Sequence, residues 1–469
     1  MNRSRREFIK HTGLAAGTAL FAPGAIQGAG FIHSKEEDVS IELAKVNSNF
    51  EREPLIRPFG FKGGYMSEIW QTVSYFQSAG GTESIGLCTQ NVLWSDAAVF
   101  GGNSEAGGNA LMYAITERAG QMLHSEKFTS PVTLQEQILT ELYDYAAKVT
   151  RNPDLRMTFV LNALVGVDNA LWMLYARENG LTSFDQMIPE AYRPALSSRH
   201  DKVASIPLMA YSIPISEIEQ AAAEGYFFMK IKIGQPGTQQ EMLEKDKARI
   251  SAIHKAIGHV RTPHTANGKL PYYFDANGRY EKKKTLNRLI DHMKKIGAFE
   301  QVQVVEEPFP EHADIDVSDI PLRLAADESA HTDKDALERI EMGYKAIALK
   351  AIAKTMSMTM KIAQVAHEKG VPCFCADLTV NPILVEWNKV VASRLAPFPG
   401  LGMGLLETNG HQNYKNWQRM RSFHPYPDDE WTKTKDGIFT LGKDYYDKSA
   451  GILEISDHYM KLVQPPFKK

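Results

Sequence analysis

The stretch that decides the fold runs from residue 226 to residue 277. It reads YFFMKIKI (226–233), then the amphipathic segment QQEMLEKDKARISAIHKAIG (239–258), then PYYFDAN (271–277). The middle segment has apolar residues at three- and four-residue spacing and ends in the glycine that commonly closes a helix. A strand, a helix and a second strand in this order predict a parallel strand pair joined by a helical crossover.

The same unit recurs over residues 201–410. Eight short apolar runs end in polar residues there, and amphipathic segments separate most of them. The runs are SIPLMAYS, YFFMKIKI, PYYFDAN, VQVVEEP, LRLAADE, YKAIALK, VPCFCAD and GLGMGLLE. Eight such runs predict an α/β barrel, and barrel enzymes build their sites at the C-terminal ends of the strands.

A different pattern precedes the barrel, over residues 45–200. Residues 59–94 alternate in polarity and turn at Gly-Gly pairs, which indicates a small antiparallel sheet. Three helices are predicted after it, at 109–123, 133–150 and 158–179, the second capped by Thr133 with Glu136 three residues on. We therefore expect a sheet-then-helices domain before the barrel.

Composition limits the class of protein. A chain of 469 residues with 43% hydrophobic residues can form a large barrel with an added domain. The formal net charge of −3, with basic residues scattered among acidic ones, argues against nucleic acid as a partner. The three cysteines, Cys88, Cys373 and Cys375, lack disulfide-framework or zinc spacing and are expected to be buried small residues.

The N-terminus predicts export. SRREFIK (4–10) precedes a weakly apolar Ala/Gly-rich run, and together they resemble a twin-arginine signal, although a plain basic terminus would also explain them. We expect residues 1–30 to be removed, the twin-arginine export machinery to be a partner, and the protein to be periplasmic. We expect no second run of transmembrane length, and hence no stable membrane insertion.

Carboxylates follow three successive predicted strands. PYYFDAN supplies Asp275, VQVVEEP supplies Glu306 with Glu307, and LRLAADE supplies Asp327 with Glu328. Each of these turns, taken alone, is common as a helix cap or a solvated strand end. Since successive barrel strands end at the same rim, the three together predict one oxygen-rich site. Such ligands suit Mg²⁺, with Mn²⁺ as a candidate substitute.

Lysines flank these carboxylates. Lys230 and Lys232 lie two residues apart on one strand, so both point to the same face. A half-exposed edge strand would explain this pair alone. However, Lys350 ends the strand that follows the acidic series. We therefore expect lysines on both sides of the barrel mouth, where two bases could face one substrate carbon.

This ordered set resembles the enolase superfamily, and within it the muconate lactonizing enzyme subgroup. LVGVDNALWMLYARENGLTSFDQMIP (164–189) is similar to the capping-domain helix of that family, and DGIFTL (436–441) to its C-terminal strand. The resemblance implies an α/β fold, a modified TIM barrel of (β/α)7β type with an α+β capping domain. Residues 411–469 would return to the capping domain.

The resemblance also implies roles. Lys232 would be a catalytic base with Lys230 beside it, and Lys350 the opposing acid or base. Asp275, Glu306 and Asp327 would bind the metal, with Glu307 and Glu328 as neighbours and Glu328 as a substitute ligand. The implied reaction removes a proton next to a carboxylate of a small substrate, through an ene-diolate that the metal stabilises.

Several functions and details stay open. A racemase or epimerase is expected first, with a dehydratase or cycloisomerase as the alternative and a non-catalytic envelope binding protein as a third. The eighth run continues GLLETNG with only Glu407 acidic, where dipeptide epimerases of this subgroup carry two aspartates, which argues against dipeptides. Asp377 is expected to be a capping residue, and the loops FKGGYM (61–66) and GGNSEAGGN (101–109) to lie over the mouth. A homo-oligomer is also left open.

Overall fold

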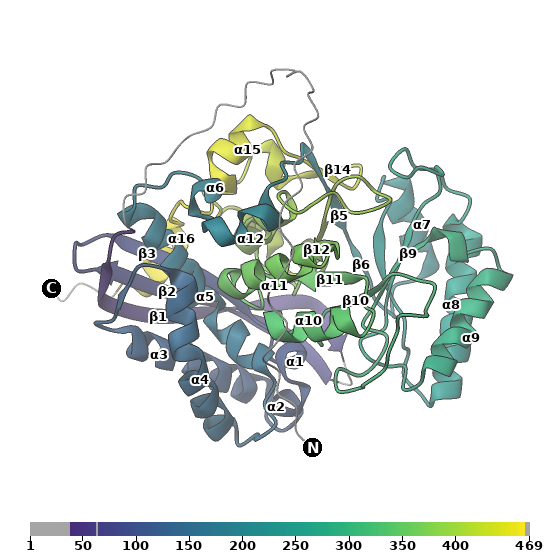
Figure 1. Cartoon of the computed structure of the whole chain (residues 1–469), viewed down its shortest axis with the longest axis horizontal. Helices are drawn as coiled ribbons and strands as arrows, with labels where there is room; N and C mark the ends of the chain where they lie inside the picture. The colour runs from purple at the N-terminus through teal and green to yellow at the C-terminus, as the bar shows by residue number, and fades with distance from the viewer. Residues whose placement is uncertain (1–37, 62–63, 465–469) are drawn as a thin grey trace, which may run out of the picture. The chain divides into compact units, whose positions relative to one another are not determined.

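An antiparallel sheet opens the computed structural model, which describes residues 38–61 and 64–464 (Figure 1). Its strands are β1 (Ile41–Phe61), β2 (Gly64–Ser78), β3 (Glu83–Gln90) and β4 (Lys127–Phe128), in the order β3-β2-β1-β4. The predicted sheet is confirmed. The predicted signal segment, residues 1–30, lies outside the described residues.

Helices pack against this sheet and complete the capping domain. They are α1 (Val92–Ser95), α2 (Ala97–Gly101), α3 (Glu105–Leu123), α4 (Pro131–Thr150), α5 (Met157–Glu178), α6 (Phe184–Met187) and the 3-10 helix η1 (Glu190–Leu196). The predicted cap at Thr133 is wrong, because α4 begins at Pro131 with Ser130 as N-cap. Proline at the first helical position suits a helix start, since its missing N–H has no partner to lose there.

Helix α5 is the core of the capping domain. It has 22 residues and is long and apolar enough to cross a membrane, so the expectation that no second run reaches that length is wrong. However, 94% of its apolar window is buried inside the protein. Its polar residue Asp168 accepts hydrogen bonds from the backbone N–H of Ser357 at 3.0 Å and from its hydroxyl at 2.5 Å. These bonds make α5 a core helix that joins the capping domain to the barrel.

The eight predicted barrel runs all form strands. They are β5 (Lys202–Ile206) with β6 (Leu208–Met209), β7 (Met229–Lys232), β8 (Tyr272–Asp275), β9 (Val302–Glu306), β10 (Leu324–Ala326), β11 (Ala346–Leu349), β12 (Cys373–Cys375) and β13 (Gly404–Glu407). Neighbours from β6 round to β13 and β5 are parallel. Pro207 divides the first run, so that β5 pairs with β13 while β6 pairs with β7. The sheet thereby curls into a barrel.

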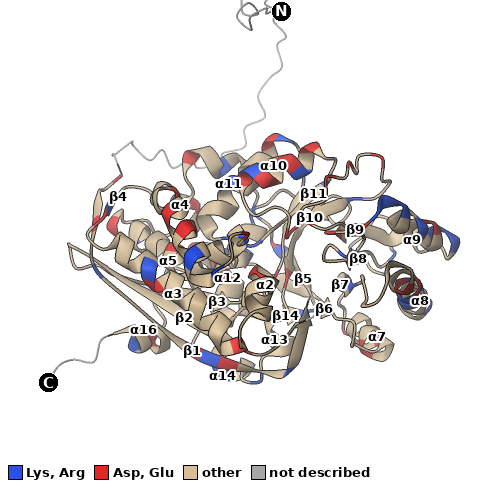
Figure 2. Cartoon of the chain, turned by 90° about the horizontal axis from the view of Figure 1, so that it is seen from below, with Lys and Arg blue, Asp and Glu red and all other residues tan. Residues whose placement is uncertain are grey.

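Helices cover the outside of this sheet. They are α7 (Ile215–Ala223), α8 (Gln239–Ile257), α9 (Lys283–Lys295), α10 (Asp333–Glu341), α11 (Met356–Glu368) and α12 (Pro382–Ala392), with the 3-10 helix η2 (Phe299–Gln301) before β9. Residues 307–323, between β9 and β10, form a crossover without a helix. Figure 2 colours the acidic and basic residues along these outer helices, and Lys and Arg are concentrated on α9. The apolar faces that the sequence predicts therefore point inward.

Large and small apolar side chains together fill the inside of the barrel. Phe228, Tyr273 and Phe374 pack there against small residues such as Ala325 and Ala348. This filling leaves a packed core rather than a pore. The three cysteines are free and buried, as predicted.

The C-terminal residues pack on both parts. They form α13 (Gly410–Asn413), α14 (Trp417–Arg421), η3 (Glu430–Thr432), β14 (Thr434–Lys435), β15 (Ile438–Thr440), α15 (Lys443–Asp447), η4 (Ser449–Gly451) and α16 (Asp457–Val463). Strand β15 pairs antiparallel with β5 of the barrel. In α16, Leu462 accepts a hydrogen bond from Asn49 of β1 at 2.8 Å, and His458 contacts Glu51 of β1 at 2.9 Å.

Candidate active site at the barrel mouth

Strand register places the first site residues side by side. Lys232, Asp275 and Glu306 are the last residues of β7, β8 and β9, and they pair laterally in that order. All three are buried. The predicted convergence of strand ends is therefore confirmed for these positions.

Lys230 lies two residues earlier on β7 and extends into a ring of carboxylates. Its Nζ is 3.0 Å from Asp275 Oδ2, 2.8 Å from Glu306 Oε1 and 3.1 Å from Glu407 Oε2. Burial opposes its charge, but these carboxylates raise the pKa of Lys230 well above its usual value. Lys230 is therefore a fixed ammonium, and the edge-strand interpretation of this lysine is wrong.

One lysine does not neutralise three carboxylates. Burial, together with the neighbouring Asp275 and Asp327 carboxylates, raises the pKa of Glu306 well above its usual value. Glu306 also accepts a hydrogen bond from the Tyr273 hydroxyl. Asp275, by contrast, is buried but lies between Lys230 and Lys232, which together lower its pKa to about 2. Glu306 therefore binds a proton more readily than Asp275 does.

Lys232 faces the solvent side of this ring. Its Nζ donates to Asp275 Oδ2 at 2.5 Å and to Asn277 Oδ1 at 2.6 Å. Asn277 in turn donates to Glu328 Oε1 at 3.0 Å, and its φ of 45° lies in the left-handed region that asparagine tolerates. Asn277 therefore links the β7 lysine to the carboxylates of β10.

Two lysines contact Asp327 from the far side of the barrel. Lys350 donates to Asp327 Oδ2, and Lys354 donates to the Asp327 backbone oxygen at 2.7 Å. Burial opposes the charge of Lys350, but Asp327 raises its pKa above the usual value. Burial, with Lys350 nearby, lowers the pKa of Lys354. Lys354 holds the Asp327 main chain, and sequence reasoning missed it because it follows the strand by four residues.

Glu307 turns away from the mouth. Its φ is 39°, and its Oε2 accepts hydrogen bonds from the backbone N–H of Asp327 at 2.8 Å and from Ser329. Burial and the Glu328 carboxylate raise the pKa of Glu307 to about 7. Glu307 is therefore a neighbour that shapes the β10 turn, which agrees with the role expected for it.

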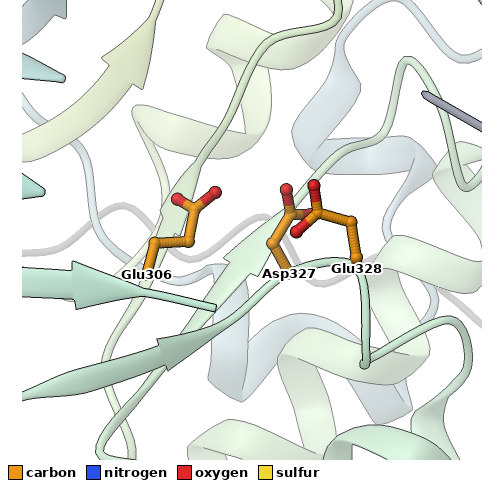
Figure 3. Close-up of side chains that lie close together, drawn as sticks. All are labelled: Glu306, Asp327 and Glu328. Atoms are coloured by element: carbon orange, nitrogen blue, oxygen red, sulfur yellow. The ribbon is translucent and has the colours of Figure 1, made fainter. Parts of the chain in front are cut away.

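Glu306, Asp327 and Glu328 form the carboxylate cluster that could hold a metal ion. One oxygen from each lies within 4.8 Å of the others, and all three residues are buried (Figure 3). Asp275, the third ligand predicted from the sequence, lies beside Glu306 across the Lys230 ammonium. Its role as a ligand stays a prediction, and Glu328, the expected substitute, takes its place in the cluster.

The charge balance of the mouth fits a divalent cation. Six buried carboxyl groups lie there with four buried lysines: Asp275, Glu306, Asp327, Glu328, Asp377 and Glu407 against Lys230, Lys232, Lys350 and Lys354. Glu328 Oε2 is buried without a hydrogen-bond partner among the described residues. Unpaired carboxylate oxygens at this density suit Mg²⁺, which prefers oxygen ligands.

Asp377 and Glu407 close the ring between β12 and β13. Asp377 accepts hydrogen bonds from the backbone N–H groups of Leu378 and Asn409, both at 2.7 Å, as expected for a capping residue. Burial and Glu407 raise the pKa of Asp377 to about 7. Glu407 accepts from Lys230 and from the Asn409 amide. Both carboxylates are therefore occupied by the protein itself.

Two cavities that share lining residues lie between the capping domain and the barrel. The inner one, of about 40 Å³, is lined by Lys232, Lys350, Asp275, Asp327 and Glu328 together with other mouth residues. The outer cavity has a volume of about 970 Å³. Four residues line both cavities: Phe59, Leu208, Lys232 and Asn277. A substrate at the inner cavity therefore has room for a substituent in the outer one.

The capping domain contributes different residues than expected. Gly64 and Tyr65 of FKGGYM line the outer cavity, whereas Phe59, Asn91 and Trp94 reach the inner one. No residue of GGNSEAGGN lines either cavity, and α3 begins inside that segment, at Glu105. Asn91 and Trp94 carried no sequence signal, because only the folded chain brings them to the mouth.

The barrel segment belongs to a known family. Residues 215–397, from α7 to just beyond α12, match the family model described as Enolase C-terminal domain-like. This part of the chain is therefore an enolase-superfamily C-terminal domain of the mandelate racemase/muconate lactonizing enzyme type. Comparison with curated proteins gave no match.

Solved structures share the whole arrangement at low sequence identity. The dipeptide epimerase from Enterococcus faecalis V583, complexed with Mg and L-Leu-L-Tyr, has a TM-score of 0.56 and 16% identity, over 80% of this chain and 92% of that one. A mandelate racemase/muconate lactonizing protein from Herpetosiphon aurantiacus has a TM-score of 0.58 and 15% identity, over 85% of this chain and 96% of that one. The N-succinyl Arg/Lys racemase from Bacillus cereus ATCC 14579 has a TM-score of 0.57 and 14% identity, over 80% of this chain and 89% of that one. These likenesses confirm the predicted fold, a capped enolase-like barrel.

Replacing Lys230 with methionine should destabilise the protein strongly. The substitution leaves Asp275, Glu306 and Glu407 buried without their shared ammonium, and breaking a buried ion pair costs about 3–5 kcal/mol. Urea denaturation at pH 7 measures the loss. Unpaired carboxyl groups have raised pKa values in the folded state, so the loss should shrink at pH 5, where they bind protons.

The matched control is Lys247→Met. Lys247 contacts Glu244 at 3.1 Å on the surface of α8, where solvent screens the ion pair and its contribution to stability is small. If Lys230→Met were no more harmful than this control, the carboxylate ring would not depend on Lys230.

Proposed function

We propose that this protein is a Mg²⁺-dependent racemase or epimerase that removes and returns a proton next to a substrate carboxylate. One observation carries the proposal. Lys232 at the end of β7 and Lys350 directly after β11 come from opposite sides of the barrel and line the same inner cavity as Asp327 and Glu328 of the carboxylate cluster. Two potential bases facing one substrate carbon are what inversion of that carbon needs.

Glu306 and Asp327 would hold the metal, with Glu328 or Asp275 completing the set. When bound, Mg²⁺ would supply positive charge to the substrate carboxylate oxygens as negative charge develops on them. The similar dipeptide epimerase contains Mg, which supports this choice of ion.

The lysines would divide the proton transfers. Lys232, oriented by Asp275 and Asn277, would take or return the proton on one face of the carbon. Lys350, oriented by Asp327, would do the same on the other face. Lys230, locked among three carboxylates, would stay charged and keep positive potential beside the reacting centre.

The substrate would be a small carboxylate with a sizeable substituent at the reacting carbon. Lys232 also lines the 970 Å³ outer cavity, and part of the wall of that cavity is apolar, with Leu208, Met209 and Ile213. Glu407 is occupied by Lys230 and Asn409, which leaves it poorly placed to bind a substrate ammonium. An N-acylated amino acid therefore suits the site better than a dipeptide.

Exchange of the substrate hydrogen with deuterated water tests the two-base proposal. The assay screens N-acylated amino acids, dipeptides, hydroxy acids and acid sugars as both enantiomers. Because each lysine reaches one face only, Lys350→Ala should still exchange one enantiomer without converting it. Lys232→Ala should retain exchange of the other enantiomer only. Mass spectrometry and chiral chromatography measure exchange and conversion.

An exposed lysine provides the control, since Lys443→Ala should leave both activities unchanged. Equal loss of exchange from both enantiomers in either site variant, with Mg²⁺ binding intact, would exclude the two-base mechanism. A keto acid product would instead support a dehydratase, in which one lysine abstracts the proton and the other assists the leaving group.

We also propose that the protein is exported by the twin-arginine pathway to the periplasm. The support is the SRREFIK segment with Arg5 and Arg6 ahead of a weakly apolar run. Changing both arginines to lysine keeps the charge and should leave the full-length protein in the cytoplasm. Cell fractionation with immunoblotting measures this, and unchanged export would refute the proposal.

A further inference from the structure

Trp94 brings a capping-domain side chain into the inner cavity. It lies on α1, directly after β3, and is only 5% exposed. Its ring faces the barrel, with Lys350 Nζ 4.3 Å from the ring centroid. A cation at this distance over an indole is attracted by the ring, so Trp94 contacts one of the two proposed bases.

The indole N–H of Trp94 has no hydrogen-bond partner among the described residues. Buried indole N–H groups usually find an acceptor, as Trp172 does with Ser357 at 3.0 Å and Trp70 with Glu68 at 3.1 Å. An unpaired buried donor costs free energy that a hydrogen bond to an oxygen acceptor would recover.

The backbone of Trp94 is fixed relative to the carboxylate cluster. Arg156 donates to the Trp94 carbonyl at 2.8 Å and to the Glu328 carbonyl at 3.1 Å, and it pairs with Glu311 at 2.6 Å. The same guanidinium therefore holds α1 of the capping domain and the turn after β10. The main chain that carries Trp94 is therefore held in place relative to the carboxylate cluster.

We propose that the Trp94 indole N–H donates a hydrogen bond to the substrate, so that the site binds only ligands with an oxygen acceptor beside the reacting carbon. The acceptor is a carboxylate oxygen or an acyl carbonyl oxygen. This inference rests on the proposed function of the site, because it takes the inner cavity as the place of the reacting carbon. The face of the indole ring contacts Lys350, and the N–H at its edge donates to the ligand oxygen.

Calorimetric binding of two probes in the presence of Mg²⁺ tests the contact. Oxalate offers carboxylate oxygens only, whereas N-acetyl-L-leucine adds an acyl oxygen. Trp94→Phe keeps a ring over Lys350 but removes the N–H, so it should weaken at least one probe about tenfold, the effect of one hydrogen bond to a charged or polar acceptor. Loss with oxalate identifies a carboxylate acceptor, and loss with N-acetyl-L-leucine alone identifies an acyl acceptor.

Trp431→Phe is the matched control. Trp431 is also buried with an unpaired N–H, but it lines neither the inner nor the outer cavity, so both probes should bind unchanged. If Trp94→Phe bound both probes like the wild type, the contact would be refuted. Failure of the wild type to bind either probe would overturn both the contact and the proposed carboxylate chemistry.

Two further measurements distinguish failure of the Trp94 contact from failure of the proposed reaction. In wild-type protein labelled with ¹⁵N-indole, one of the six tryptophan N–H signals should shift when the bound probe is added, which tests the contact even if Trp94→Phe folds poorly. An unmoved set of signals at saturation refutes it. A wild type that binds both probes but exchanges no substrate hydrogen refutes the proposed reaction and leaves the contact standing.

Discussion

The arrangement of the site depends on one electrostatic constraint, the excess of buried carboxylates over lysines at the barrel mouth. Lys230 is shared by Asp275, Glu306 and Glu407, and Asp327 is shared by Lys350 and Lys354. Unpaired buried charges are among the most expensive features a fold can contain. A fold that concentrates them at the ends of adjacent strands gains little stability by doing so. The concentration fits a site for a metal ion.

The capping domain supplies the other half of the site. The barrel presents charged groups from its strand ends, whereas the capping domain adds aromatic and amide side chains, including Phe59, Asn91 and Trp94. Bonds between the two parts fix this arrangement, among them those of Asp168 with Ser357 and of Arg156 with Glu328. The charged groups thus belong to the barrel, and the walls of the two cavities come from both the capping domain and the barrel.

Much of the barrel could be predicted because its signals are local. Each strand and its crossover helix carry their own pattern, and parallel topology then brings Lys232, Asp275 and Glu306 to one level. Other features depend on contacts across the chain and could not be predicted. Trp94 and Lys350 are more than 250 residues apart, and nothing near either one predicts their contact. Similarly, adjacent Asp327 and Glu328 left open which of them would point inward, and the structure places both carboxylates in the cluster.

Calorimetric titration of Mg²⁺ into chelator-treated protein at pH 7 tests most directly whether the carboxylate cluster at the barrel mouth binds a metal ion. We expect one Mg²⁺ per chain, a higher melting temperature with bound ion, and loss of binding in Glu306→Gln and Asp327→Asn. Comparison of Asp275→Asn with Glu328→Gln then identifies the third ligand by the larger loss of affinity. Absence of Mg²⁺ binding by the folded wild type, or unchanged affinity in Glu306→Gln, would contradict the account.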